Sequence, residues 1–213
     1  NIPKGRNILD AGAGELQYKR FCKHLKYTSQ DFGQYTGEGD NSGLQTGSWD
    51  NSKLDIVSDI LNIPVKDSSF DAIMCVEVFE HIPKPVEALK EFSRILKKNG
   101  HLILTAPFAC LTHFAPYFYY NGFSQYFYRD LLEDLGFEII DLNLNGNYFE
   151  YLAQEIRRFE GVGEQYAGDA KKASAIESLS QHVLLRRLKE LSEKDMGSSE
   201  LAVHGINVLA VKK

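Results

Sequence analysis

An apolar stretch that runs directly into two closely spaced glycines constrains the fold of this chain most. The apolar residues before Asp10 predict a buried strand that ends at this acid. Gly12 and Gly14 allow a tight turn that a ligand can approach without meeting a side chain. We expect a helix behind the turn, from about residue 15 to 25, whose first N–H groups favour a carboxylate or another anion. The stretch predicts an α/β protein with a ligand site at the end of this strand.

The acid before the glycines distinguishes between possible ligands. A dinucleotide site would carry a third glycine at position 17, where Gln17 stands, and a phosphate would be repelled by Asp10. A ligand with an ammonium and a sulfonium group would be attracted, and S-adenosylmethionine carries both. We therefore expect S-adenosylmethionine as the cofactor and S-adenosylhomocysteine as its product. A nicotinamide-dependent oxidoreductase is the alternative that the missing glycine disfavours.

The stretch Asp10–Gly14 resembles the first motif of the class I S-adenosylmethionine-dependent methyltransferases. Further matches between residues 69 and 102 resemble the type 11 methyltransferase domain, so that the resemblance covers about residues 5 to 107. Asp31 follows the turn by roughly 20 residues, a spacing at which an acid accepts hydrogen bonds from ribose hydroxyls. The resemblance implies that Asp59 and Ile60 contact the adenine. The expected cofactor-binding residues are Asp10, Ala11, Gly12, Ala13, Gly14, Asp31, Phe32, Asp59, Ile60 and Glu77.

The hydrophobic pattern alternates between strands and helices, which predicts a parallel sheet with helices on both faces. The resemblance implies a Rossmann-like seven-stranded sheet, mostly parallel, with an antiparallel last strand. We expect one methyltransferase domain over residues 1–213, with a cofactor half (1–107) and a substrate half (108–213). A helical insertion at about 148–194, broken near residues 161–163 and 168, precedes the last strand. The expected strands are 7–10, 26–32, 54–57, 70–76, 101–105, 137–142 and 203–211, and the expected helices outside the insertion are 15–25, 85–97 and 124–135.

Catalytic candidates follow the strand at 70–76. Transfer to a hydroxyl or amine requires alignment of the acceptor and removal of a proton. His81 is the first choice for the base, together with Glu80, because an unperturbed histidine has a pKa near 6.5. The spacing Glu77-x-x-Glu80-His81 also resembles the E-x-x-E-H site of metal-assisted O-methyltransferases of the ubiquinone and small-RNA pathways, and His113 could supply another ligand. The preferred prediction assigns no metal ligand, and a metal-assisted O-methyltransferase that uses Glu77, Glu80 and His81 is the alternative.

An aromatic segment from residue 107 to 128 follows the strand at 101–105. We expect it to form the wall of the acceptor pocket, with His113, Tyr117 and Tyr120 contacting a small-molecule or sugar-containing acceptor that is methylated on oxygen or nitrogen. A hydrophobic subdomain or a dimer contact is the other interpretation of the same residues. A non-catalytic binding module with a methyltransferase fold is a further alternative for the whole chain.

Composition limits the class of protein. The net charge of −5 and the pI of about 5.7 argue against a nucleic-acid binder. Three cysteines without a C-x-x-C pair fit a reducing cytoplasm. No apolar run approaches the 18 residues of a membrane span. We therefore expect a cytoplasmic enzyme that does not bind nucleic acid and has no membrane span, and we keep a homodimer as one interpretation.

Overall fold

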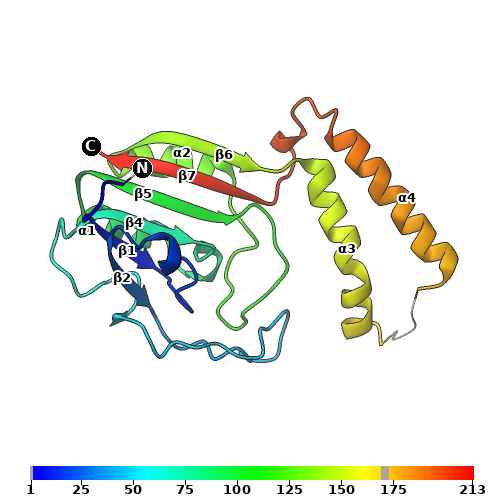
Figure 1. Cartoon of the computed structure of the whole chain (residues 1–213), viewed down its shortest axis with the longest axis horizontal. Helices are drawn as coiled ribbons and strands as arrows, with labels where there is room; N and C mark the ends of the chain where they lie inside the picture. Colours follow the sequence, from blue (N-terminus) through cyan, green and yellow to red (C-terminus); the bar gives the residue numbers. More distant parts are fainter. Residues whose placement is uncertain (1, 169–172) are drawn as a thin grey trace. The chain divides into compact units, whose positions relative to one another are not determined.

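The computed structural model describes residues 2–168 and 173–213, which divide into two compact units (Figure 1). The first unit comprises Asn1–Asn143 and Gly205–Lys213, and the second comprises Leu144–His204. The division sets the predicted helical insertion apart in a unit of its own. That the whole chain acts as one methyltransferase domain stays a prediction.

The described residues of the first unit are built on a seven-stranded sheet with the order β3-β2-β1-β4-β5-β7-β6. β1 is parallel to β2 and β4, β4 is parallel to β5, and β7 is antiparallel to β5. The predicted Rossmann-like sheet with an antiparallel last strand is confirmed. The strands are β1 (Asn7–Ala11), β2 (Lys26–Asp31), β3 (Ile56–Val57), β4 (Phe70–Val76), β5 (Leu96–Pro107), β6 (Phe137–Asn145) and β7 (Gly205–Lys212).

The two central strands explain why the sequence folds this way. β1 and β4 have partners on both sides and carry consecutive apolar residues that are almost completely buried, among them Leu9 and Ile73. A parallel strand that is covered on both faces needs such a continuous apolar run, rather than an alternation of apolar and polar residues. The carboxyl ends of β1 and β4 are therefore neighbours, and each leads into a turn.

The prediction of a helix from residue 15 to 25 is wrong. Leu16 adopts a left-handed backbone (φ 62°), and its N–H group donates to the carbonyl of Ala13, three residues back. Turns of the same spacing continue to Leu25, and only the 3₁₀-helix η1 (Lys19–Phe21) forms among them. A left-handed residue at the start prevents the α-helical hydrogen-bond pattern from beginning. The segment still covers the sheet, because Cys22 and Leu25 pack with the apolar core over β1 and β4.

Helix α1 (Pro85–Ile95) connects β4 to β5 and buries the apolar face that the sequence predicts, including Leu89 and Phe92. It ends two residues before the expected Lys97, because Leu96 is extended and begins β5. Helix α2 (Gln125–Asp134) follows the aromatic segment, and Gly136, with φ 80°, turns the chain into β6.

The second unit is a helical hairpin of α3 (Tyr148–Tyr166) and α4 (Ala175–Ser192), followed by the 3₁₀-helix η3 (Ser198–Glu200). Figure 1 shows the two helices side by side. α3 continues through residues 161–163, so the break predicted there is wrong, whereas the break predicted near residue 168 coincides with the helix end. Among the described residues, no helix is both long and apolar enough to cross a membrane.

Candidate functional site

The glycine turn after β1 is tied to the end of β2. Gly12 and Ala13 donate to the carbonyl of Gln30 at 2.8 and 2.9 Å, and Gly14 donates to Oδ2 of Asp31 at 3.0 Å. The turn residues thus use their N–H groups within the protein. No α-helix begins behind the turn among the described residues, where only the three-residue η1 forms, so the helix N-terminus expected to bind a carboxylate is not formed.

Asp31 lies at the carboxyl end of β2 and is buried. Its Oδ1 accepts from the N–H of Gly33 at 2.9 Å, and its Oδ2 accepts from Gly14. A carboxylate oxygen has two lone pairs, so that each oxygen retains one for a ligand hydroxyl. The adjacent Phe32 is half-buried. Its ring lies nearly perpendicular to that of Tyr117, with the two ring centroids 4.8 Å apart. A cofactor contact of either residue stays a prediction.

Asp10 is a buried acid beneath the glycine turn, with 1% of its surface exposed. The Tyr27 hydroxyl on β2 donates to its Oδ2 at 2.5 Å. Burial raises the pKa of Asp10 to about 6; the Tyr27 hydrogen bond opposes this rise and the charge of Asp31 adds to it. At neutral pH Asp10 therefore carries a negative charge under the turn, which suits a cationic ligand group.

The expected adenine residues follow β3. Ile60 is buried, whereas Asp59 is exposed and accepts the N–H of Leu61 on its Oδ1 at 2.9 Å. This is a local Asx turn. The loop that follows is fixed by Arg94 of α1, which donates to the carbonyls of Ile63 and Val65. A contact of Asp59 with a cofactor remains a prediction.

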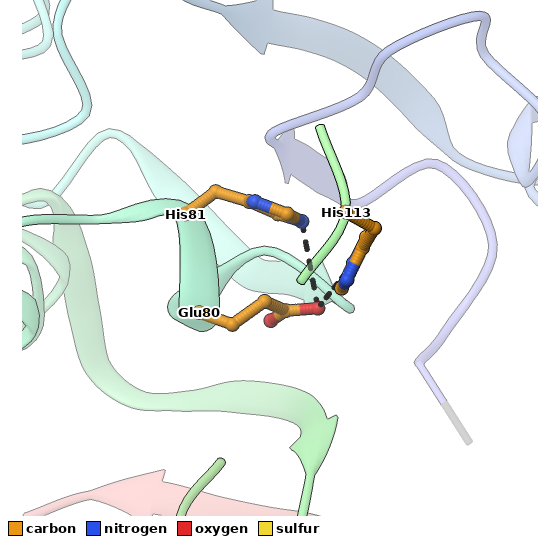
Figure 2. A group of neighbouring side chains, drawn as sticks. All are labelled: Glu80, His81 and His113. Atoms are coloured by element: carbon orange, nitrogen blue, oxygen red, sulfur yellow. Dashed lines mark ion pairs between the residues drawn. The ribbon is translucent and has the colours of Figure 1, made fainter. Parts of the chain in front are cut away.

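The turn after β4 places three chemically active side chains together. The 3₁₀-helix η2 (Phe79–His81) carries Glu80 and His81, and His113 comes from the aromatic segment after β5. His81 Nε2 and His113 Nε2 lie 3.6 and 3.7 Å from Glu80 Oε1. Figure 2 shows both rings directed toward the same carboxylate oxygen. The three potential ligand atoms lie within 4.8 Å of one another, and we call these residues the triad.

Backbone carbonyls fix both imidazole rings of the triad. His81 Nδ1 lies 2.6 Å from the carbonyl of Tyr117, and His113 Nδ1 lies 2.9 Å from that of Leu111. Because a carbonyl only accepts, each Nδ1 carries the proton, and each Nε2 of a neutral ring presents a lone pair. Glu80 is 1% exposed, and its Oε2 has no hydrogen-bond partner among the described residues. Three lone-pair atoms that face one another inside the protein require a cation, either a proton or a metal ion.

Protonation of the triad is asymmetric. Burial lowers the pKa of His81, which keeps this ring neutral. Burial also acts to lower the pKa of His113, but its contacts with Cys110, Glu80 and the Leu111 carbonyl outweigh that effect and raise it to about 10. In the metal-free protein, a proton on His113 thus balances the charge of Glu80.

Glu77 lies outside the triad. It is exposed, adopts φ 54°, and accepts the hydroxyl of Thr105 at 2.7 Å. Among the described residues, the candidate ligand atoms that converge belong to Glu80, His81 and His113, and Glu77 is not part of this set.

The expected acceptor residues are anchored on the same turn. Tyr120 donates its N–H to the carbonyl of Glu80 at 3.2 Å and its hydroxyl to that of Pro83 at 3.3 Å. Tyr117 lies between the triad, through its carbonyl, and Phe32, through its ring. The aromatic segment is therefore attached to both the cofactor side and the triad side of the site.

Three residues that shape the site were not among the predicted site residues. Tyr27 partners Asp10, Trp49 packs on Gly14, and Phe114 stacks on His81 at 5.2 Å. The one signal for Trp49 was a single tryptophan within a long loop rich in glycine, serine and asparagine. Nothing in the local sequence indicates the other two contacts, because each joins segments that are distant along the chain.

Comparison with known proteins agrees with this geometry. Residues 9–104 match the family model described as a methyltransferase domain. This part of the chain is therefore similar to a methyltransferase domain. The model match covers β1 through most of β5, which is the part of the sheet that holds the glycine turn, Asp31 and two members of the triad.

The chain is similar to curated methyltransferases and to solved structures. The chain is 26% identical over 110 residues to norajmaline N-methyltransferase of Rauvolfia serpentina, covering 47% of this chain and 36% of that protein. It is 23% identical over 104 residues to a ubiquinone biosynthesis O-methyltransferase of Marinobacter nauticus, covering 47% and 44%. A SAM-dependent methyltransferase structure from Archaeoglobus fulgidus superimposes with a TM-score of 0.58 at 16% identity, covering 98% and 86%. The chain thus spans less than half the length of these curated relatives, and their names differ in the methylated atom.

Proposed function

We propose that this protein is an S-adenosylmethionine-dependent methyltransferase that methylates a hydroxyl oxygen of a small-molecule or sugar-containing acceptor. The convergence of Glu80, His81 and His113 carries the proposal. Their turn follows β4, the strand beside β1 with its glycine turn. In open α/β sheets, ligands bind outside the carboxyl ends of the strands, so that the two turns face one ligand space.

The residues at the carboxyl ends of β1 and β2 fit the cofactor. S-adenosylmethionine supplies a methyl group that is already activated by the sulfonium, so the protein has to align the acceptor and remove its proton. Asp31 retains acceptor capacity for the ribose hydroxyls. Asp10 and Glu77 contribute negative charge near the turn, which favours the cationic end of the cofactor.

The triad fits a divalent transition-metal ion. Imidazole nitrogens suit zinc, iron, nickel or copper better than magnesium. The backbone carbonyls that hold both Nδ1 atoms are the outer partners that metal-binding histidines usually have. A bound ion would polarise an acceptor hydroxyl and lower its pKa. Three protein ligands leave a position open for the acceptor, as in catalytic zinc sites. This chemistry favours transfer to oxygen over transfer to nitrogen.

The second candidate uses the same side chains without a metal ion. His81 is neutral because burial lowers its pKa, and its Nε2 can accept a proton from the acceptor. Glu80 Oε1, at 3.6 Å, then stabilises the resulting imidazolium. In this form His81 and Glu80 act as the base pair expected from the sequence.

Transfer assays with labelled cofactor test the proposal. We expect purified protein to label hydroxyl compounds such as phenols and sugars, to lose activity with a chelator, and to regain it with zinc, iron or nickel. Transfer that survives chelation would support the metal-free candidate. Transfer only to amines, peptides or nucleic acids would contradict the proposed acceptor class. Binding of S-adenosylhomocysteine without any transfer would support a non-catalytic module.

Charge and exposed apolar residues bear on the partners of the protein. An acidic protein of net charge −5 favours a small acceptor over a nucleic acid, and a cytoplasmic location stays a prediction. The proposed homodimer is supported by the exposed apolar side chains of Ile176, Leu179 and Val183 along α4. Light scattering should give a dimer mass for the native chain and a monomer mass for Leu179→Asp. A monomeric native chain would contradict the homodimer.

A further inference from the structure

The loop between β2 and β3, residues 33–53, connects the glycine turn to the triad. At the glycine turn, a Cβ built on Gly14 would lie 2.5 Å from Cζ2 of Trp49, so that only glycine lets the indole pack this closely. Next to it, the N–H of Asp50 donates to Oε1 of Glu15 at 3.1 Å. The loop therefore covers the turn where the cofactor is expected to bind.

The middle of the same loop holds the segment that carries His113. Leu44 donates its N–H to the carbonyl of Thr112 at 2.9 Å and accepts the N–H of Phe114 at 3.0 Å. These two bonds form a parallel bridge between Leu44 and His113. A shift of the loop would therefore move the backbone that positions the His113 ring.

An aromatic stack joins the two ends directly. Trp49 meets the edge of Phe114 with ring centroids 5.2 Å apart, and Phe114 stacks on His81 at 5.2 Å with an interplanar angle of 18°. Tyr35, which is buried inside the loop, stacks on the same phenylalanine at 4.4 Å. One ring thus contacts both the residue that covers Gly14 and a member of the triad.

We propose that Trp49 and Phe114 are positioning residues that make cofactor binding and metal binding cooperative. This inference rests on the proposed function, because it takes the cofactor at the glycine turn and a metal ion on the triad. A metal ion that fixes His81 and His113 also fixes Phe114, Trp49 and the loop of residues 33–53, which pack on them. The cofactor then binds against a loop that is already ordered. By thermodynamic linkage, the cofactor must strengthen metal binding by the same factor.

Calorimetry with S-adenosylhomocysteine and Zn²⁺ measures the coupling. We expect the dissociation constant of S-adenosylhomocysteine to fall about tenfold when chelated protein is loaded with zinc, within the usual range of allosteric coupling. The dissociation constant of zinc should fall by the same factor when S-adenosylhomocysteine is present. Zinc alone should also change the emission of Trp49, the single tryptophan of the chain.

Two substitutions and a control locate the coupling. Trp49→Ala should still bind each ligand, but the ratio between the two S-adenosylhomocysteine constants should fall close to one. Trp49→Phe, which keeps a ring over Gly14, should retain most of the ratio. Phe21→Ala removes an exposed ring on η1 and should leave the ratio unchanged.

The outcomes separate this inference from the function on which it rests. If both ligands bind and zinc leaves the S-adenosylhomocysteine constant unchanged or weakens it, the coupling is wrong and the proposed function stands. If coupling persists in Trp49→Ala, it does not pass through this residue and the inference is wrong. If S-adenosylhomocysteine does not bind the native chain at all, the proposed function fails and the coupling fails with it. If only zinc does not bind, the coupling is wrong and the metal-free form of the proposed function stands.

Discussion

The turns that follow β1 and β4 are neighbours in the sheet, and each is associated with a buried carboxylate. Asp10 and Glu80 are both 1% exposed. The Asp10 side chain accepts one hydrogen bond among the described residues, from the hydroxyl of Tyr27. Glu80 faces two imidazole nitrogens, and its second oxygen has no partner among the described residues. The ends of two neighbouring strands thus carry buried acids with different surroundings.

The difference separates binding from chemistry. A carboxylate with a single neutral donor keeps its charge at neutral pH at a cost in stability, and it provides a field for a cationic ligand. A carboxylate that faces two imidazole nitrogens brings several lone pairs close together. These lone pairs can bind a proton or a metal ion. Perturbing each acid should therefore affect different properties of the protein.

Substitution of Glu80 should have the largest effect. We expect Glu80→Gln to slow methyl transfer at least about a hundredfold, because the amide removes the charge needed to hold a metal ion or an imidazolium. S-adenosylhomocysteine binding to the chelated protein should change little. Glu87→Gln on the exposed side of α1 is the matched control. A parallel loss of cofactor binding in Glu80→Gln would contradict the separation of the two turns.

The pH dependence of stability should report Asp10. In the folded protein Asp10 holds its proton up to about pH 6, whereas the unfolded chain releases it near 3.8. The contribution of this group to the free energy of unfolding is therefore greatest below pH 3.8 and falls as the pH rises to about 6, by about 3 kcal/mol. Urea unfolding at several pH values should show that Asp10→Asn lacks this loss. Identical pH profiles for both proteins would exclude a raised pKa.

Substitution of Asp31 should weaken cofactor binding by a smaller amount. Asp31→Asn keeps an acceptor for one turn N–H group but loses the charge, so S-adenosylhomocysteine should bind about 10- to 100-fold more weakly, as expected for charged hydrogen bonds. Calorimetry measures this change. Asp40→Asn, an exposed acid in the loop that follows β2, is the control. Equal affinities for Asp31→Asn and the native chain would show that the ribose does not bind here.

The smallest effect is expected for Tyr27. Tyr27→Phe removes the one hydrogen bond described for the Asp10 side chain and should lower the free energy of unfolding by about 1 kcal/mol at acidic pH. Since this bond holds the pKa of Asp10 down, the pKa should move above 6 in the variant. A carboxyl titration followed by nuclear magnetic resonance would detect the shift. A lower Asp10 pKa in the variant would contradict the role assigned to the hydroxyl.

The sequence predicts the sheet well because its signals are local. The apolar run at β4 and the amphipathic pattern of α1 each lie within one segment, and both elements form close to the expected positions. The helix expected after Gly14 does not form, because the left-handed conformation of Leu16 depends on how the turn packs. Continuous helix through residues 161–163 likewise shows that glycine inside a helix is a cost that neighbouring residues can outweigh.

The candidate site was predictable only in part. Glu80 and His81 are adjacent in sequence, so that their spacing alone suggests a joint role. His113 was considered both as an acceptor contact and as a further ligand, and only the fold brings it to Glu80. Trp49 and Phe114 meet through loop packing that no periodicity encodes.

The two ends of the helical unit are neighbours within that unit. The N–H of His204 donates to the carbonyl of Asn145 at 2.9 Å, so that the chain returns beside the residue from which it departed. A segment with adjacent ends adds only a loop-closure entropy that grows slowly with its length. The β6–β7 connection is therefore a permissive insertion point, at which evolution or an engineer can lengthen, exchange or excise a module without redesigning the sheet that carries the chemistry.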